Sequence, residues 1–225
     1  MGRKNKLAHF SENLTFGNYF HYTFEELTKN GVPLKGKWNS DFFKNDNPIV
    51  LELGCGKGEY TVGLARSRKQ TNHIGVDLKG ARIWRGLKTS QEENLTNVAF
   101  IRSYIELIEN FFAPEEVSEI WITFPDPQPQ NAKAKKRLTS PQFLQRYRSF
   151  LKKDGIVHLK TDSDLLYEYT LEVINAQQLP LYYHSNDLYA NNDELEVKSI
   201  RTFYEQKWLN EGLSIKYIRF GLYND

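Results

Sequence analysis

Hydrophobic residues gather in five short runs that are separated by longer, more polar segments. The runs are rich in Val and Ile and mostly lack strict alternation, which is typical of strands covered on both faces. They occupy residues 49–53, 73–77, 98–101, 119–124 and 155–160. We therefore predict five buried strands.

The segments between the runs carry helical spacing. Ser140 precedes Pro141, a favoured pair for an N-cap and a first helical position, and a second helix is predicted from Ser163. A third helix is predicted near residues 200–211 and ends at Gly212, before a last aromatic strand. Strands that alternate with helices predict βαβ units and a mostly parallel sheet, so we expect an α/β domain.

The predicted elements divide the chain into two regions. Residues 48–225 contain all of them and form the expected α/β domain. Residues 1–47 are predicted to be an N-terminal extension that is basic and partly irregular. The reason is that Gly31, Pro33 and Gly36 interrupt any long element there.

The composition is that of an ordinary globular protein. Of the 225 residues, 40% are hydrophobic and 26% are charged, with a net charge of +2. The single cysteine, Cys55, excludes an intrachain disulfide, and the five histidines show no ligand spacing, so we expect no metal. We expect a reducing, cytoplasmic location and no membrane contact. No apolar run approaches about 20 residues, and the first residues lack the apolar core of a signal peptide.

Positive charge is concentrated in a few runs although the net charge is small. Such runs occupy residues 3–6, 66–69 and 79–88. A fourth and last basic run contains Lys133, Lys135, Lys136 and Arg137. A single basic run is most often a solvated surface, whereas several together also suit a polyanion. Both interpretations remain open on this pattern alone.

A glycine-rich loop follows the first predicted strand. Gly54, Gly56 and Gly58 allow the backbone to turn tightly and to approach a ligand at a helix N-terminus. Asp77 ends the second strand, 23 positions after Gly54 (77 − 54), where a carboxylate can accept both ribose hydroxyls. Ligands of such sheets bind at the carboxyl ends of the strands. These residues therefore predict a nucleotide-like cofactor, and NAD is one cofactor that would fit them.

Two acids separate the alternatives. A dinucleotide fingerprint has a glycine at the position of Glu59, and carboxylates at Glu52 and Glu59 would repel a pyrophosphate. The same two carboxylates would attract a ligand that carries sulfonium and ammonium groups. This combination resembles motifs I and II of class I S-adenosylmethionine-dependent methyltransferases. The resemblance implies a Rossmann-like sheet, mostly parallel with an antiparallel C-terminal strand, and helices on both faces.

Residues 124–138 form a second unusual segment. Three prolines surround one acid, Asp126, and exclude both helix and central strand, so a stiff loop presents a carboxylate just before the last basic run. This order resembles the bacterial tRNA (guanine-N7)-methyltransferase family. Other matching stretches are VLELGCGKGEYTVGLA, GVDLKGAR, LKKDGIVHLKTD and TFYEQKWLNEGLSIKYIRF, and together they span roughly residues 1–222.

The resemblance implies S-adenosylmethionine as cofactor and tRNA as partner, with methylation at N7 of a variable-loop guanosine. The loop glycines, Glu52 and Asp77 would contact the cofactor, and Asp126 would lie at the junction of cofactor and guanine. The guanine would be held by Asp162 and by the family's T-x-[FY]-E motif, which is present here as Thr202, Tyr204 and Glu205. Phosphates would be held by the last basic run, Lys133, Lys135, Lys136 and Arg137.

A few positions depart from the family pattern. Gln128 and Gln130 stand where the family usually has Trp and Lys, and Gln130 is kept as a substrate-binding candidate. Lys133 takes the place of a usual His. Tyr104 stands near the expected adenine, where it would either stack on the base or pack. A catalytically impaired RNA-binding module with the same fold stays an alternative, and the sequence does not decide between monomer and homodimer.

Overall fold

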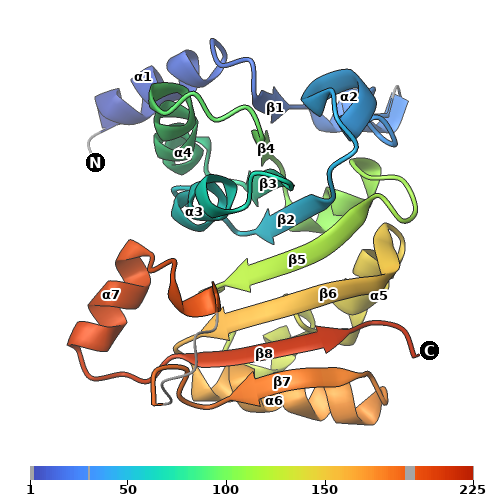
Figure 1. Ribbon diagram of the computed structural model, residues 1–225, viewed down its shortest axis with the longest axis vertical. Coiled ribbons are helices and arrows are strands. Elements are labelled where there is room, and N and C mark those ends of the chain that lie inside the picture. The colour runs from blue at the N-terminus through green and yellow to red at the C-terminus, as the bar shows by residue number, and fades with distance from the viewer. Residues whose placement is uncertain (1–2, 30, 191–195, 225) are drawn as a thin grey trace.

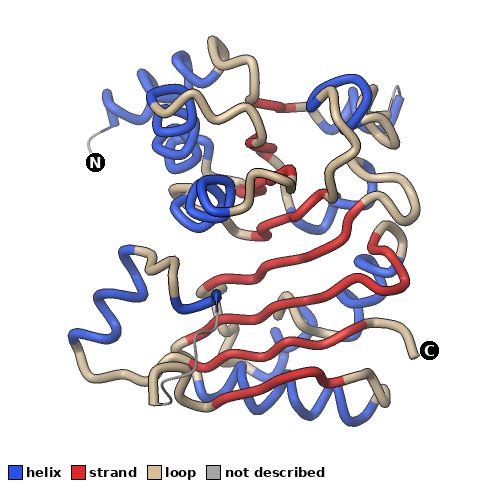
Figure 2. The backbone as a smooth tube through the Cα atoms, viewed as in Figure 1, coloured by secondary structure: helices blue, strands red, loops and turns tan. Residues whose placement is uncertain are grey.

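The computed structural model describes residues 3–29, 31–190 and 196–224, and these form one eight-stranded sheet with helices on both sides (Figures 1 and 2). The strand order is β1-β4-β3-β2-β5-β6-β8-β7. The strands are β1 (Tyr19–His21), β2 (Ile49–Leu53), β3 (Asn72–Asp77), β4 (Val98–Arg102), β5 (Val117–Thr123), β6 (Leu151–Thr161), β7 (Leu181–Ser185) and β8 (Lys216–Gly221).

The sheet is parallel from β1 to β6, and β8 is antiparallel to both of its neighbours. In Figure 1 the arrowheads of β2, β5 and β6 point one way and that of β8 points the other way. The register places Leu51 beside Ile74 on one side and Ile120 on the other. The predicted mostly parallel sheet with an antiparallel C-terminal strand is confirmed.

All five predicted strands are present, and two further strands were not predicted. β6 begins earlier than expected, at Leu151. β1 contains three residues at one edge of the sheet, and β7 forms the opposite edge with two of its side chains half-buried and three exposed. Neither edge strand forms a buried apolar run, which is the signal that identified the central strands.

The helices are α1 (Arg3–Asn13), α2 (Phe24–Lys29), α3 (Glu59–Ser67), α4 (Gly80–Glu92), α5 (Pro141–Arg148), α6 (Asp164–Ala176) and α7 (Phe203–Asn210). The three predicted helices are present as α5, α6 and α7, and α1, α2 and α4 were not predicted. Ser140 and Ser163 stand at the N-cap positions of α5 and α6, and the Ser163 hydroxyl accepts from the Leu166 amide. Gly212 adopts a left-handed φ of 77° just beyond α7, as expected for a residue that ends a helix.

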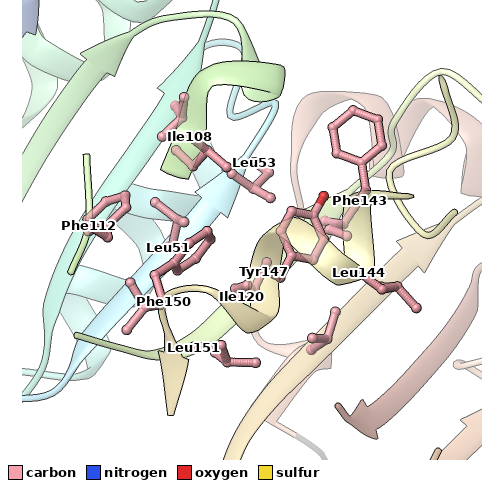
Figure 3. Close-up of a cluster of buried hydrophobic side chains, with 14 of the residues drawn as sticks. Leu51, Leu53, Ile108, Phe112, Ile120, Phe143, Leu144, Tyr147, Phe150 and Leu151 are labelled. Carbon is pink, nitrogen blue, oxygen red and sulfur yellow. The ribbon is translucent and has the colours of Figure 1, made fainter. Parts of the chain in front are cut away.

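The two faces of the sheet have separate cores. Leu51 and Leu53 point to the face covered by α5 and α6, where Leu144 and Tyr147 of α5 join a large apolar cluster (Figure 3). Alternate residues point to the other face, which is covered by α3, α4 and the segment that leads into α7. The loops at the carboxyl ends of the parallel strands lie between these layers, and α7 lies beside the ends of β5 and β6 (Figure 1).

Residues 1–47 contain more regular structure than Gly31, Pro33 and Gly36 predict. α1 packs on α4, where the Asn13 side chain donates to the Gly80 carbonyl at 2.8 Å. β1 adds an edge strand to the same sheet by pairing with β4. In the described part of the chain, no helix is long and apolar enough to cross a bilayer.

Candidate active site

The glycine-rich loop joins β2 to α3 at the carboxyl edge of the sheet. Gly54, Gly56 and Gly58 have left-handed φ values of 81°, 56° and 71°, a region that side chains with a Cβ rarely adopt. A Cβ on Gly58 would also lie 2.6 Å from the Phe100 ring. The loop is therefore specified by its glycines, and it leaves backbone amides and the start of α3 facing the site.

Asp77 fixes this loop from the end of β3. Its Oδ2 accepts from the Gly56 amide at 2.9 Å and its Oδ1 accepts from the Lys79 amide at 2.7 Å. Each carboxylate oxygen has a second lone pair, so the side chain can still accept from a ligand. Asp77 thus has both a structural contact and a free face on the cavity described below.

Glu52 is buried beneath the loop. Its Oε1 accepts from the Thr123 hydroxyl at 2.6 Å, and its Oε2 accepts from the Thr61 amide at 2.8 Å and from the Thr61 hydroxyl. Burial raises the pKa of Glu52 to about 7, although these hydrogen bonds favour the charged form. A cationic ligand close to Glu52 would favour its ionisation.

The proline-rich loop presents Asp126 to solvent at the end of β5. Phe124 and Gln128 have left-handed φ values of 49° and 46°, and the Asp126 Oδ1 accepts from the Gln128 amide at 2.9 Å. Arg137 donates to the Gln128 carbonyl at 3.1 Å and to the Pro127 carbonyl at 3.2 Å. The loop is therefore fixed by backbone contacts that do not depend on the Gln128 side chain.

Arg137 does not share the exposed position of the lysines that precede it. Its side chain is buried and its guanidinium lies 4.3 Å from the centroid of the Tyr169 ring. The expectation that Arg137 holds a phosphate does not suit this position, because the guanidinium is occupied by the proline-rich loop. Lys133, Lys135 and Lys136 lie exposed in or at the end of the short helix Asn131–Lys136, which Gln130 precedes.

A cavity of about 480 Å³ brings most of the predicted cofactor residues together. Its lining residues include Gly54, Asp77, Tyr104, Asp126 and Lys136. Tyr104 is exposed beside the cavity, so its ring is available for stacking.

A smaller cavity of about 80 Å³ adjoins the first one and shares Gly54, Phe124 and Arg82 with it. It is lined by Glu52 from beneath the loop and by Thr202 and Tyr204 from the start of α7. Residues about 150 positions apart in the sequence therefore meet at one site (202 − 52 = 150). Arg82 was missed as a site residue because a basic helical residue resembles any solvated surface residue.

Glu205 faces away from this opening. Its side chain is fully buried, with Oε1 2.7 Å from the Lys160 Nζ and 2.6 Å from the Tyr189 hydroxyl. The Lys160 Nζ also donates to the carbonyls of Val197 and Ile200, at 2.8 and 3.2 Å. The last residue of the T-x-[FY]-E motif is thus bound to the sheet, and this contact fixes the position of the segment that carries Thr202.

Two further contacts complete the carboxyl edge. The Glu59 Oε2 accepts from the Phe203 amide at 2.8 Å and so connects α3 to α7. Asp162 follows β6 with a half-buried side chain, while its carbonyl accepts from the Lys216 Nζ at 3.0 Å. Asp162 is not among the residues that line either cavity. Within the described residues, no group of three or more His, Cys, Asp or Glu could hold a metal ion.

The arrangement of this site at the carboxyl edge is that of class I methyltransferases. One solved structure with the same fold, titled "Structure of an Antibiotic Related Methyltransferase", has a TM-score of 0.59 and 17% identity, and the match covers 84% of this chain and 94% of that chain. A second, the 16S rRNA methyltransferase KamB, has a TM-score of 0.62 and 12% identity, with 82% and 92% covered. At such identities the likeness is one of fold.

Sequence comparison is more specific. The family model described as "Putative methyltransferase" matches residues 46–218. The tRNA (guanine-N(7)-)-methyltransferases of Christiangramia forsetii and Bacteroides thetaiotaomicron are 58% and 52% identical, over 98% and 97% of this chain and 99% and 86% of their own length. That of Cytophaga hutchinsonii is 44% identical over 98% of each chain. The chain belongs to the tRNA (guanine-N(7)-)-methyltransferase family, as its motifs predict.

Proposed function

We propose that this protein transfers the methyl group of S-adenosylmethionine to N7 of a variable-loop guanosine in tRNA. The observation that carries the proposal is the meeting of Asp77, Asp126, Thr202 and Tyr204 at two adjoining cavities. Membership in the family supplies the choice of substrate.

The residues present suit S-adenosylmethionine. The glycine loop permits close approach of the ligand, and the free face of Asp77 is placed to accept from ribose hydroxyls. Glu52, Asp77 and Asp126 supply negative charge for a cationic ligand, and Tyr104 supplies an exposed ring. When bound, the cofactor supplies an electrophilic methyl group on sulfur.

The reaction depends on the alignment of N7 with the methyl group more than on a general base. Guanine N7 has an in-plane lone pair and no proton, so the protein has to hold N7 in line with the methyl group at roughly 3 Å. The product base is cationic, and a carboxylate at Asp126 suits that developing charge. We assign Asp162, Thr202 and Tyr204 to hold the base. Glu205 is assigned to position them, because its carboxylate is bound to Lys160.

The lysines of the short helix Asn131–Lys136 are assigned to the tRNA backbone. Lys133, Lys135 and Lys136 are exposed, and Lys136 also lines the larger cavity beside Asp126. Gln130 precedes this helix and is assigned to the same surface. Such contacts weaken with salt, and log K falls by roughly 0.7–0.9 per neutralised phosphate.

The test is methyl transfer from labelled S-adenosylmethionine to unmodified tRNA, with the modified base mapped by cleavage at 7-methylguanosine. Asp126→Ala is expected to lower kcat/KM about 100-fold or more. Asp154→Ala is the matched control, since Asp154 is an exposed acid toward the opposite end of β6. Label at another base, or equal loss in both variants, would contradict the assignment.

The same experiment decides the alternative of an RNA-binding module. Binding of cofactor and tRNA by the unaltered protein without any transfer would favour that alternative. It would also point to Gln128 and Gln130 as the positions where activity was lost. The structure offers one argument against this outcome, because the Gln128 contacts that order the loop all come from its backbone.

A further inference from the structure

A third cavity, of about 580 Å³, lies between α3, α4 and the residues just before α7. It is open and lies next to the active site, and none of its lining residues belongs to the helix Asn131–Lys136. The charged and aromatic residues that line it are Lys57, Glu59, Arg66, Arg85, Arg201 and Phe203. We refer to this cavity as the α3–α4 groove.

The lining of the α3–α4 groove is strongly basic. Among its described lining residues, four are cationic and only Glu59 is acidic, and the Glu59 carboxylate already accepts from the Phe203 amide. Arg66 pairs with Glu93, just beyond α4, and Arg85 pairs with Glu92 at the end of α4, and all four side chains are 38–50% exposed. Exposed pairs of this kind are weak and can be exchanged for a phosphate.

The remaining two cations of the groove rest on aromatic rings. The Lys57 Nζ lies 4.9 Å from the centroid of Phe203, and the Arg201 guanidinium lies 4.6 Å from that of Tyr189. Within the described residues, neither cation lies within ion-pair distance of a carboxylate. Each of these cations thus lies against a ring, beside the groove that we consider for an anion.

Phe203 connects the groove to the active site. Its side chain is 59% exposed, and it lines both the α3–α4 groove and the small cavity that contains Thr202 and Tyr204. A ring of this size that is kept exposed beside a cation is suited to stacking on a base. Arg82 lies just beyond, where its Nη2 is 3.5 Å from the Tyr204 hydroxyl.

We propose that the α3–α4 groove binds the sugar-phosphate backbone of the substrate RNA next to the target guanosine, and that Phe203 stacks on a neighbouring base. The inference rests on the proposed function and adds a second contact surface to the lysines near Asp126. Basic grooves with aromatic side chains are the usual construction for single-stranded RNA. A base whose N7 must be reached has to leave its stack, so single-stranded nucleotides on both sides of it are expected.

The first test measures tRNA binding over a range of salt concentrations. The double variant Lys57→Ala/Arg201→Ala is expected to lower the slope of log K against log[salt] by roughly 0.7–0.9 for each phosphate that the protein no longer neutralises. Lys153→Ala is the matched control, because Lys153 is an exposed cation near the start of β6 and far from the carboxyl edge in the strand. Its slope is expected to equal that of the unaltered protein. Lys57→Ala alone guards against a folding defect, because it leaves Arg201 in place on the Tyr189 ring.

The second test addresses Phe203. Phe203→Ala is expected to weaken tRNA binding about 10-fold at constant salt slope, because stacking is not an ionic contact, and Phe203→Tyr is expected to restore it. An unchanged slope in the double variant and unchanged affinity in Phe203→Ala would overturn the inference.

Failure of this inference can be told apart from failure of the proposed function. If the unaltered protein methylates tRNA at guanine N7 and the groove variants bind like the control, only the groove assignment is wrong. If the unaltered protein transfers no methyl group to tRNA, the proposed function itself is wrong, whatever the slopes show.

Discussion

The sheet face beneath α5 and α6 is packed with apolar side chains (Figure 3), whereas the face beneath residues 196–205 buries charge. On the apolar face, Leu144 and Tyr147 fill space among many neighbours. On the other face, Lys160 makes directed contacts to Glu205 and to the Val197 and Ile200 carbonyls. Apolar burial stabilises without fixing direction, while a buried ion pair with hydrogen bonds can fix the position of a segment.

The charged face also shows how the partners of an acid decide its protonation state. Burial would raise the pKa of Glu119, but its contacts with His158 and with the Arg68 guanidinium outweigh this effect and lower the pKa to about 2. Glu52 lies on the same face with hydroxyl and amide partners, and burial raises its pKa to about 7. The position that the proposed function gives to a cationic cofactor is thus the one where the buried acid still lacks a cation.

The largest effect is expected from Lys160→Met. Removing this cation leaves Glu205 buried without its partner, which should lower the free energy of unfolding by about 3–5 kcal/mol in urea denaturation. The variant Lys160→Met/Glu205→Leu removes both charges and should recover most of that stability. In both variants the Val197 and Ile200 carbonyls lack the Lys160 donor, so the KM for tRNA should be higher than that of the unaltered protein in both. If Lys160→Met were as stable as the unaltered protein, the Lys160–Glu205 pair would not hold this segment.

A substitution that creates a void in the apolar face is expected to change stability alone. Leu144→Ala should lower the free energy of unfolding by about 2–5 kcal/mol, because Leu144 is fully buried and its neighbours relax only in part. Its KM for tRNA, measured well below its unfolding temperature, should match that of the unaltered protein. A raised KM for Leu144→Ala would show that the apolar face also affects tRNA binding, which contradicts the difference between the two faces.

Glu52 should make stability depend on pH in a defined direction. A carboxyl whose pKa rises from 4.5 to about 7 on folding binds its proton more tightly in the folded state. The contribution of Glu52 to the free energy of unfolding is therefore present below about pH 4.5. It is lost as pH rises toward 7, by at most about 1.4 kcal/mol per pH unit. Thermal unfolding of Glu52→Gln between pH 4.5 and 7 should lack this decline. Parallel pH curves for the two proteins would argue against a raised pKa.

The smallest effect is expected from an exposed pair on the charged face. Glu93→Ala removes the partner of Arg66 at the α3–α4 groove, and stability should change by no more than about 0.5 kcal/mol. Arg66 then becomes available to a phosphate, so tRNA binding at low salt should tighten slightly. Weaker binding would indicate that the exposed pair orders the groove.

Local sequence predicted the parts of the molecule that depend on local geometry. Gly54, Gly56 and Gly58 specify left-handed backbone, and Asp77 ends a strand whose apolar run is plain in the sequence. The prolines around Asp126 likewise exclude regular structure, whatever packs beside them. The family motifs depend on the same positions, which is why fold and family could be named before any contact was known.

Tertiary structure alone decided which charges are paired and which are free. Lys136 and Arg137 are neighbours in one basic run, yet Lys136 faces a cavity while Arg137 is buried against Gln128. Lys160 resembles any strand lysine until Glu205, 45 positions later (205 − 160), lies within 2.7 Å. The free energy of a charge depends on burial and on partners from distant parts of the chain, so spacing along the sequence cannot predict it.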